Sequence, residues 1–245
     1  MKIIVSNLFK QFKEIIFGFS TKIGPDSVPP FFFNLSLTVG DDPEKVKQNR
    51  EYFFNRLGLS TSQIAFQRQV HSDIIKFVEK PGLLGESDAL ITRYYGIGLA
   101  ISAADCTPIF IYDKENKIIA GVHSGWKGTQ KRILKKVLSN LSFHFKSKPK
   151  NLYVFLGPSI SQENYEVGKD VALLFDQKYL LFKDGRIYLD VPLANFDMLL
   201  THGIPPENIE MSRLCTFKEK VLLHSYRRDG NNSGRMFGVI ALKEK

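Results

Sequence analysis

The chain has 245 residues, of which 43% are hydrophobic and 24% charged, a composition typical of a globular protein with a sizeable core. Its 34 basic and 25 acidic residues leave a net charge of +9. Because the basic residues are scattered and accompany no nucleic-acid-binding motif, we interpret them as a solvated surface and predict no nucleic-acid partner.

Membrane insertion and an oxidising compartment are both disfavoured. No uncharged run approaches the length of a membrane span, and the N-terminal segment lacks the apolar core of a signal peptide. The two cysteines give no disulfide framework. No linker, low-complexity tract or repeat divides the chain. We therefore predict a cytoplasmic protein with a single domain over residues 1–245, without a membrane partner.

Apolar patterning predicts strands that alternate with a few helices. The first helix begins at Pro43, where Asp42 can cap it, and Gly58 ends it. Further helices are expected over residues 129–145, 169–180 and 192–202. Strands are expected over residues 64–70, 74–78, 88–92, 98–103, 107–112, 117–122, 152–156, 209–214, 221–225 and 238–242. A short hairpin among so few helices predicts an α+β fold, in which helices flank mixed β-sheets.

The hairpin points most directly to function. Polar residues 113–116 separate two apolar, β-branched segments and have a length that closes hairpins. If Tyr112 pairs with Lys117, paired residue numbers add to 229. Cys106 then lies opposite His123, with Cβ atoms roughly 4.5–5.5 Å apart. A thiolate and an imidazole at that separation can share a metal ion or act as nucleophile and base, and a buried cysteine beside a core histidine is the alternative.

Two other histidines are placed to complete a metal site. His71 follows a predicted strand, and His224 leads into a loop rich in glycine, asparagine and arginine. Spacing alone does not choose between these two residues. We interpret His144 and His202, which lie near predicted helix ends, as surface or capping residues.

Several motifs resemble the YfiH, or laccase-domain, family, and they follow the family's order along the chain. They are QVHSD, SDALIT, ADCTPIFIYD, HSGWKG, GPSISQENYEVG and HSYRRDGNNSGR. The resemblance implies a purine nucleoside phosphorylase that also deaminates adenosine and phosphorolyses methylthioadenosine, in a family described earlier as polyphenol oxidases. It implies zinc held by His71, Cys106 and His123. Lys127 replaces an arginine of the family pattern, which puts any bidentate contact there in doubt.

A zinc ion with these ligands keeps one tetrahedral position open, as catalytic zinc sites do. Water activated there could attack C6 of a purine. Cys106 and Asp105 are the catalytic candidates of this interpretation. Asp105 and Asp88 could each transfer protons or orient a ligand, with capping of a strand end as the alternative.

Arginines in the C-terminal loop are the candidates for binding phosphate. They are Arg227, Arg228 and Arg235, and a solvated basic loop is the alternative reading. The predicted partners are therefore a nucleoside and phosphate, whereas no oligomeric state is predicted. Cys215 has no histidine at a comparable mirror position and is predicted to be structural.

Two rival functions are considered. Copper also binds such donors in vitro, but a multi-copper laccase needs paired His-x-His ligands, and the chain has five histidines and no such pair. Copper-dependent oxidation would then be a side activity. The second rival is a cytoplasmic amide hydrolase that edits peptidoglycan precursors, which some members of the family resemble. The usual signature of nucleoside deaminases, H-x-E with P-C-x-x-C, is absent from the chain. Any deamination would therefore use another scaffold.

Overall fold

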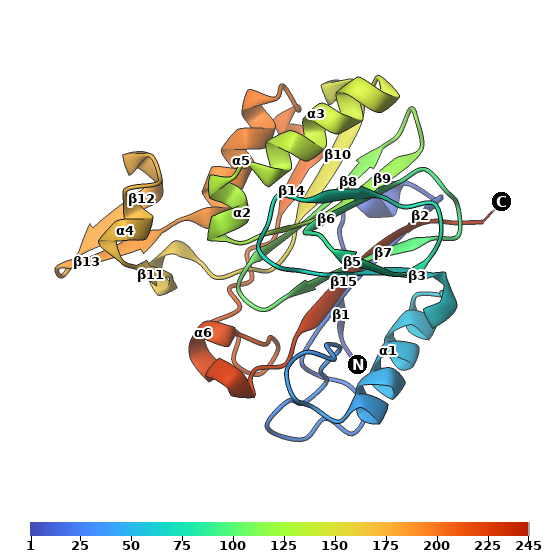
Figure 1. Ribbon diagram of the computed structural model, residues 1–245, viewed down its shortest axis with the longest axis horizontal. Helices are drawn as coiled ribbons and strands as arrows, with labels where there is room; N and C mark the ends of the chain where they lie inside the picture. The colour runs from blue at the N-terminus through green and yellow to red at the C-terminus, as the bar shows by residue number, and fades with distance from the viewer. Residues whose placement is uncertain (245) are drawn as a thin grey trace.

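Two six-stranded β-sheets face each other in the computed structural model, which describes residues 1–244 (Figure 1). In order across the first sheet, the strands are β1 (Ile3–Ile4), β2 (Ile15–Ser20), β15 (Met236–Leu242), β7 (Gly98–Ala103), β3 (Ile64–Arg68) and β5 (Gly82–Glu86). In the second sheet they are β14 (Ile209–Met211), β10 (Leu152–Leu156), β8 (Thr107–Asp113), β9 (Ile118–Ser124), β6 (Ala89–Thr92) and β4 (Ile75–Phe77). Both sheets contain parallel and antiparallel pairs.

Helices cover the outer faces of both sheets (Figure 1). Helix α1 (Pro43–Arg56) packs on the first sheet, and α3 (Ile133–Phe145) and α5 (Val191–Thr201) pack on the second. The short helices are α2 (Trp126–Gln130) and α6 (Tyr226–Asp229). A small lobe projects to one side and contains α4 (Lys169–Ala172) and the strands β11 (Glu166–Val167), β12 (Leu180–Lys183) and β13 (Arg186–Leu189).

Seven short 3₁₀ turns link these elements in the described part of the chain. They are η1 (Phe9–Gln11), η2 (Thr61–Gln63), η3 (Pro149–Asn151), η4 (Gln162–Asn164), η5 (Gln177–Tyr179), η6 (Pro206–Asn208) and η7 (Gly230–Asn232). No helix among residues 1–244 is long and apolar enough to cross a membrane.

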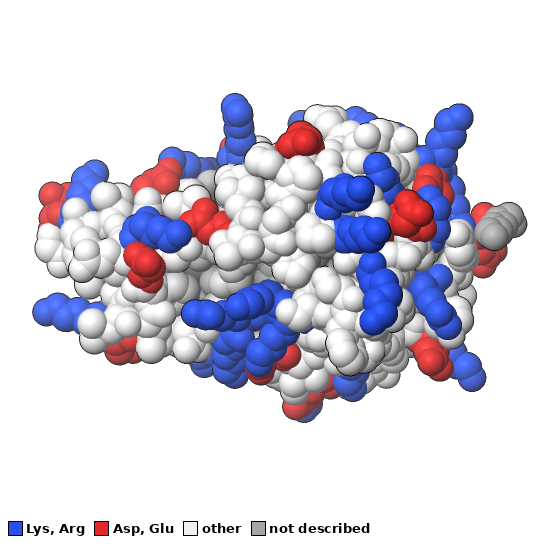
Figure 2. Space-filling view, turned by 90° about the horizontal axis from the view of Figure 1, so that it is seen from above, with Lys and Arg blue, Asp and Glu red and all other residues white. Residues whose placement is uncertain are grey.

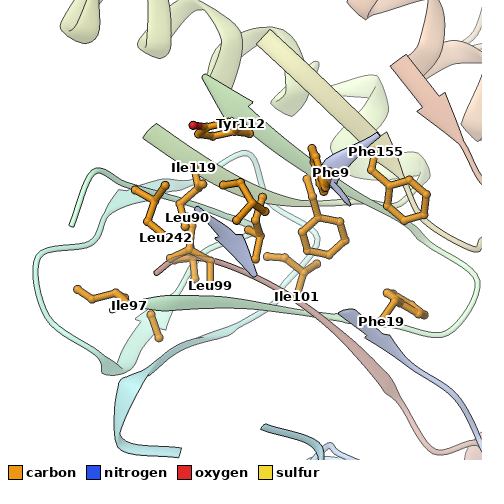
Figure 3. Packing of buried hydrophobic residues seen from close by; sticks show 14 of the residues in the cluster. Phe9, Phe19, Leu90, Ile97, Leu99, Ile101, Tyr112, Ile119, Phe155 and Leu242 are labelled. Carbon is orange, nitrogen blue, oxygen red and sulfur yellow. The ribbon is translucent and has the colours of Figure 1, made fainter. Parts of the chain in front are cut away.

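The core is layered because the inner strands are covered on both faces. Figure 3 shows the central layer, where Leu99 and Ile101 of the first sheet meet Tyr112 and Ile119 of the second. Along β8, alternate residues enter different layers, with Phe110 and Tyr112 in the central layer and Ile109 and Ile111 beneath α3. This double coverage accounts for the continuous apolar runs in the sequence. The predicted α+β fold with helix-flanked mixed sheets is confirmed.

The start of α1 is also confirmed. Pro43 is its first residue, and the carboxylate of Asp42 accepts a hydrogen bond from the backbone N–H of Glu44. Gly58 follows the helix with φ +74°, a left-handed conformation that favours glycine.

The single helix predicted over residues 129–145 is wrong, because Arg132 interrupts it with φ +59°. The hydroxyl of Thr129 in α2 bonds to Ser124 and to Asn195 of α5. Ile133 and the apolar residues after it instead pack against the second sheet. The break lets the two helices meet these different partners.

The helix predicted over residues 169–180 is wrong beyond Ala172. The carboxylate of Asp176 accepts a hydrogen bond from the backbone N–H of Lys178 and starts a separate 3₁₀ turn. The chain then forms the β12–β13 hairpin around Asp184-Gly185, which both have positive φ. An Asp-Gly pair is a favoured hairpin turn and was the signal for these strands.

The strand predicted over residues 221–225 is also wrong. The backbone N–H of Leu223 bonds to the carbonyl of Glu219 in a turn. The guanidinium of Arg228 donates to the carbonyl of Leu223. Val221 is 79% exposed, so extension of this segment would bury little apolar surface. His224 consequently lies in a turn region.

The β8–β9 hairpin is present, but its predicted register is wrong by two. Paired residue numbers add to 231, with Pro108 opposite His123. The carboxylate of Asp113 accepts hydrogen bonds from the N–H groups of Glu115 and Asn116, so the strands pair as far as Asp113 and the turn begins one residue later than predicted. Because a shift of two preserves the face of a strand, Cys106 and His123 stay on one side and become diagonal neighbours.

A polar cluster joins the start of β2 to this hairpin. The carboxylate of Glu14 accepts hydrogen bonds from Lys117 Nζ at 2.7 Å and from the Tyr112 hydroxyl at 2.6 Å. These two bonds, in that order, lower the pKa of Glu14 to about 2. The carboxylate therefore stabilises the fold only while it is ionised.

We predict that Glu14→Gln lowers the free energy of unfolding by about 1 kcal/mol at pH 7, a value reduced for solvent screening of this partly exposed pair. Since the folded pKa lies below the ordinary value of 4.5, the contribution is complete above that value and is lost as the pH falls toward 2. Urea unfolding of both proteins should show less than half of the difference at pH 3. An unchanged difference at pH 3 would contradict the assignment.

Candidate metal centre

Three possible metal ligands from separate segments meet at one end of the second sheet. His71 follows β3, Cys106 precedes β8, and His123 lies near the end of β9. Their ligand atoms all lie within 4.8 Å of one another, and Cys106 Sγ is 3.8 Å from His71 Nε2. A tetrahedral zinc ion with ordinary bond lengths needs roughly 3.6 Å between sulfur and nitrogen. The predicted grouping is therefore present, and it could hold a metal ion.

The buried carboxylate of Asp88 holds two of these ligands. One oxygen lies 2.8 Å from His123 Nδ1 and accepts the backbone N–H of His71 at 3.1 Å. The other accepts the backbone N–H and the hydroxyl of Ser72, both at 2.6 Å. The bond to Nδ1 leaves His123 Nε2 free for a metal. Asp88 also fixes the strained loop in which His71 has φ +57°.

The charges within the group favour a bound cation. Burial raises the pKa of Cys106, but charge and hydrogen bonding from His123 and then His71 outweigh it and lower the pKa to about 6. Burial lowers the pKa of His123, whereas the Cys106 thiolate and Asp88 raise it to about 9. Burial raises the pKa of Asp88, but hydrogen bonds from His123 and Ser72 lower it to about 2. The thiolate and the carboxylate thus favour positive charge at His123, which a metal ion bound at Nε2 could supply in place of a proton.

Gly125 leaves the space that the thiol occupies. A Cβ atom at this position would lie 2.6 Å from Cys106 Sγ and 3.3 Å from His71 Cδ2. The φ of Gly125 is −77°, which any residue adopts, so space and not backbone freedom requires glycine.

Asp105 connects the metal ligands to the C-terminal loop. Its backbone has φ +92°, and one oxygen of its carboxylate accepts the hydroxyl of Thr216 at 2.6 Å. The other oxygen accepts the backbone N–H of Arg227 at 2.6 Å. Asp105 thereby holds the start of α6 beside Cys106.

The three candidate arginines differ in their partners. All five N–H groups of Arg228 are engaged, with the carboxylate of Asp229 and the carbonyls of Thr216, Phe217 and Leu223. These bonds direct the guanidinium into its own loop. Arg228 therefore holds the loop in place and has no donor left for a ligand.

Arg227 and Arg235 keep donors that have no acceptor among residues 1–244. Arg227 donates to the carbonyl of Glu166 in the lobe at 2.7 Å and lies 4.8 Å from the centre of the Tyr165 ring. Arg235 lies 5.3 Å from the Tyr226 ring, and its Nη1 atom donates to two loop carbonyls. Burial lowers the pKa of Arg235, while the charges of Asp105 and Cys106 oppose that effect. Arg235 is therefore close enough to Asp105 and Cys106 to interact with their charges.

His224, a possible metal ligand by sequence, and Cys215, predicted to be structural, both lie outside the ligand group. His224 is buried, and burial together with the charge of Lys22 lowers its pKa to about 3, so it stays neutral. Cys215 is buried, and its sulfur accepts hydrogen bonds from the backbone N–H and the hydroxyl of Ser161. Cys215 thus packs within the C-terminal half of the chain, whereas His224 lies close to Lys22 and Phe33 of the N-terminal segment.

Sequence reasoning missed the space requirement at Gly125 and the contact of the lobe with Arg227. The first arises because Gly125, and not His123, faces Cys106 in the true register. The second needs the position of β11, a two-residue strand without a sequence signal of its own.

We predict that Gly125→Ala weakens metal binding by about 10- to 100-fold while the fold is kept, because the added methyl group displaces the thiol. Metal retention against a competing chelator, measured by elemental analysis, and thermal unfolding would test this. Gln130→Ala, an exposed change in α2, is the control and should bind metal normally. Normal metal retention by Gly125→Ala would refute the prediction.

The chain resembles known proteins over nearly its whole length. Residues 16–243 match the family described as "Multi-copper polyphenol oxidoreductase laccase". A Deinococcus radiodurans protein named purine nucleoside phosphorylase is 34% identical over 93% of this chain and 89% of its own. Adenosine deaminase RL5, from an unknown prokaryotic organism, is 32% identical over 86% of this chain and 87% of its own.

A solved structure agrees with this relationship. The Bacillus licheniformis hypothetical protein YfiH superposes with a TM-score of 0.93 at 30% identity, over 98% of this chain and 96% of its own. The sequence and the fold thus point to the same set of relatives. The chain belongs to the laccase-domain family, whose members include enzymes named as purine nucleoside phosphorylases and an adenosine deaminase.

Proposed function

We propose that this protein is a zinc-dependent purine nucleoside phosphorylase that acts on adenosine, inosine and methylthioadenosine and also deaminates adenosine. The observation that carries the proposal is the group of His71, Cys106 and His123 beside two arginines with unused donors. The names of the relatives supply the substrate class. The ligand group supplies the site for a metal, and the arginines supply the site for an anion.

The ligand set suits zinc. One thiolate and two imidazoles are common zinc ligands, and a three-residue set is typical of catalytic sites. Zinc in such a site acts as a Lewis acid and lowers the pKa of water. Copper also accepts these ligands, so a copper-loaded protein with weak oxidase activity is compatible with the same residues.

We assign phosphate binding to Arg227 and Arg235. Guanidinium groups form charge-assisted, often bidentate bonds to phosphate oxygens. Each of these two arginines lies over a tyrosine ring, which limits the orientations of its guanidinium. Phosphorolysis requires the phosphate to be held against the sugar carbon that carries the base. Two restrained cations next to the metal ligands meet that requirement.

We assign positioning roles to Asp88, Asp105 and Arg228. Asp88 keeps the ring of His123 oriented, and its low pKa keeps it ionised. Asp105 holds the backbone of Arg227 and is the carboxylate beside Cys106 that could transfer a proton during deamination. Arg228 would contribute by ordering the loop that carries the other two arginines.

We predict that Cys106→Ala loses the bound metal together with phosphorolysis and deamination, because one of three ligands is removed. The matched variant Cys215→Ala should retain the metal and most of both activities, since Cys215 lies outside the ligand group. Elemental analysis and product chromatography of both variants would test this. Equal losses in the two variants would contradict the assignment.

We predict that Arg227→Gln and Arg235→Gln lower kcat/KM for phosphate-dependent cleavage of inosine by about 10- to 100-fold. Adenosine deamination should fall much less, because that reaction needs water and no phosphate. Release of hypoxanthine and ribose 1-phosphate measures the first reaction, and formation of inosine without phosphate measures the second. Arg56→Gln, an exposed change at the end of α1, is the control and should leave both activities unchanged.

Two outcomes would overturn parts of this proposal. Equal loss of both activities in the arginine variants would mean that the loop positions the whole nucleoside. Absence of nucleoside turnover, together with cleavage of a muramyl amide, would identify the protein as the peptidoglycan-precursor hydrolase considered above.

A further inference from the structure

The net positive charge of the molecule comes almost entirely from one segment. Residues 126–150, which span α2, α3 and the turn after them, contain eight of the 34 basic residues and no acidic residue. The other 220 residues contain 26 basic and 25 acidic residues and are nearly neutral. All eight basic side chains of this segment are exposed. Viewed from above, basic side chains gather on the face that α3 covers (Figure 2).

Four of these side chains line one concavity beside α3. It has a volume of about 600 Å³ and is lined by Lys131, Arg132, Lys135 and Lys136, with Ser139 and Asn140 as polar neighbours. We call it the α3 concavity. It is open to solvent, and none of its lining residues belongs to the metal centre.

The cations of the α3 concavity are largely uncompensated. Asp73 is the acidic residue among its lining residues, and it forms an ion pair with Lys136. The other three cations form no ion pair among residues 1–244, although Lys131 also acts on the charge of Asp73, and Arg132 and Lys135 also line a neighbouring hollow that contains Asp176 and Asp197. Four cations and one carboxylate leave the lining of the concavity with a net positive charge, which a bound anion would reduce.

We propose that the α3 concavity binds a small anion with several phosphate groups, of the nucleoside triphosphate or inorganic triphosphate class. A single phosphate would contact few of the side chains, whereas a chain of phosphates can meet three cations together. The hydroxyl of Ser139 and the amide of Asn140 provide neutral donors beside them. This site is separate from the phosphate position assigned to Arg227 and Arg235.

The test compares two double variants that each remove two charges from the same segment. Lys131→Gln with Lys135→Gln removes charge from the concavity, whereas Lys148→Gln with Lys150→Gln removes charge beyond the far end of α3, roughly 20 Å away. Lys136 is left unchanged because its pair with Asp73 supports the loop after His71. Binding of inorganic triphosphate and of ATP to the metal-loaded protein would be measured by calorimetry.

We expect the concavity variant to lose at least about tenfold in affinity for both probes and the distal variant to lose less than about twofold. Arg227→Gln should leave this binding intact, which separates the result from the proposed function. Equal weakening in both double variants would overturn the site, because it would show attraction by overall charge alone. Binding of single-stranded RNA without binding of either triphosphate would overturn it in favour of a nucleic-acid surface.

Discussion

The ionised carboxylate of Asp88 is the constraint on which the metal centre depends. It is fully buried, and it is surrounded by the backbone N–H groups of Val70, His71 and Ser72, the hydroxyl of Ser72 and Nδ1 of His123. A buried charge is stable only when such partners replace water. The same bonds hold the His71 loop in a left-handed conformation against the end of β9. These hydrogen bonds compensate for the burial of the Asp88 charge. They also bring two candidate ligands, His71 and His123, together from separate segments.

Asp105 likewise holds a separate segment, the C-terminal loop, next to Cys106. Its two oxygens bind Thr216 and the backbone of Arg227, so the C-terminal loop is fixed to the same strand end as the thiol. The lobe joins this arrangement because Arg227 donates to the carbonyl of Glu166. Metal ligands and candidate anion ligands are therefore held by different carboxylates.

The sequence correctly placed Cys106 and His123 close together, although the predicted register of the hairpin was wrong. Side chains in a strand alternate with a period of two, so a register wrong by two residues still placed Cys106 and His123 on one face. The face of a strand is a local property, whereas the register depends on how Asp113 folds the turn. The backbone partners of Arg228 could not be read from the sequence, because they are carbonyls of turns without a periodic pattern, and the segment of Leu223 was predicted to be a strand. The lobe was missed because a helix was predicted up to Leu180, where β12 begins, although the Asp184-Gly185 turn after β12 is a hairpin signal.

The histidines also bear on the family description of multi-copper oxidoreductases. Of the five, two belong to the ligand group, and His224 is buried and kept neutral away from it. The remaining two, His144 and His202, lie at the ends of α3 and α5. No histidines are left to build a cluster of several copper ions. Among residues 1–244, the chain therefore offers a single group of possible metal ligands, and Asp105 and Arg228 hold in place the loop that carries Arg227 and Arg235.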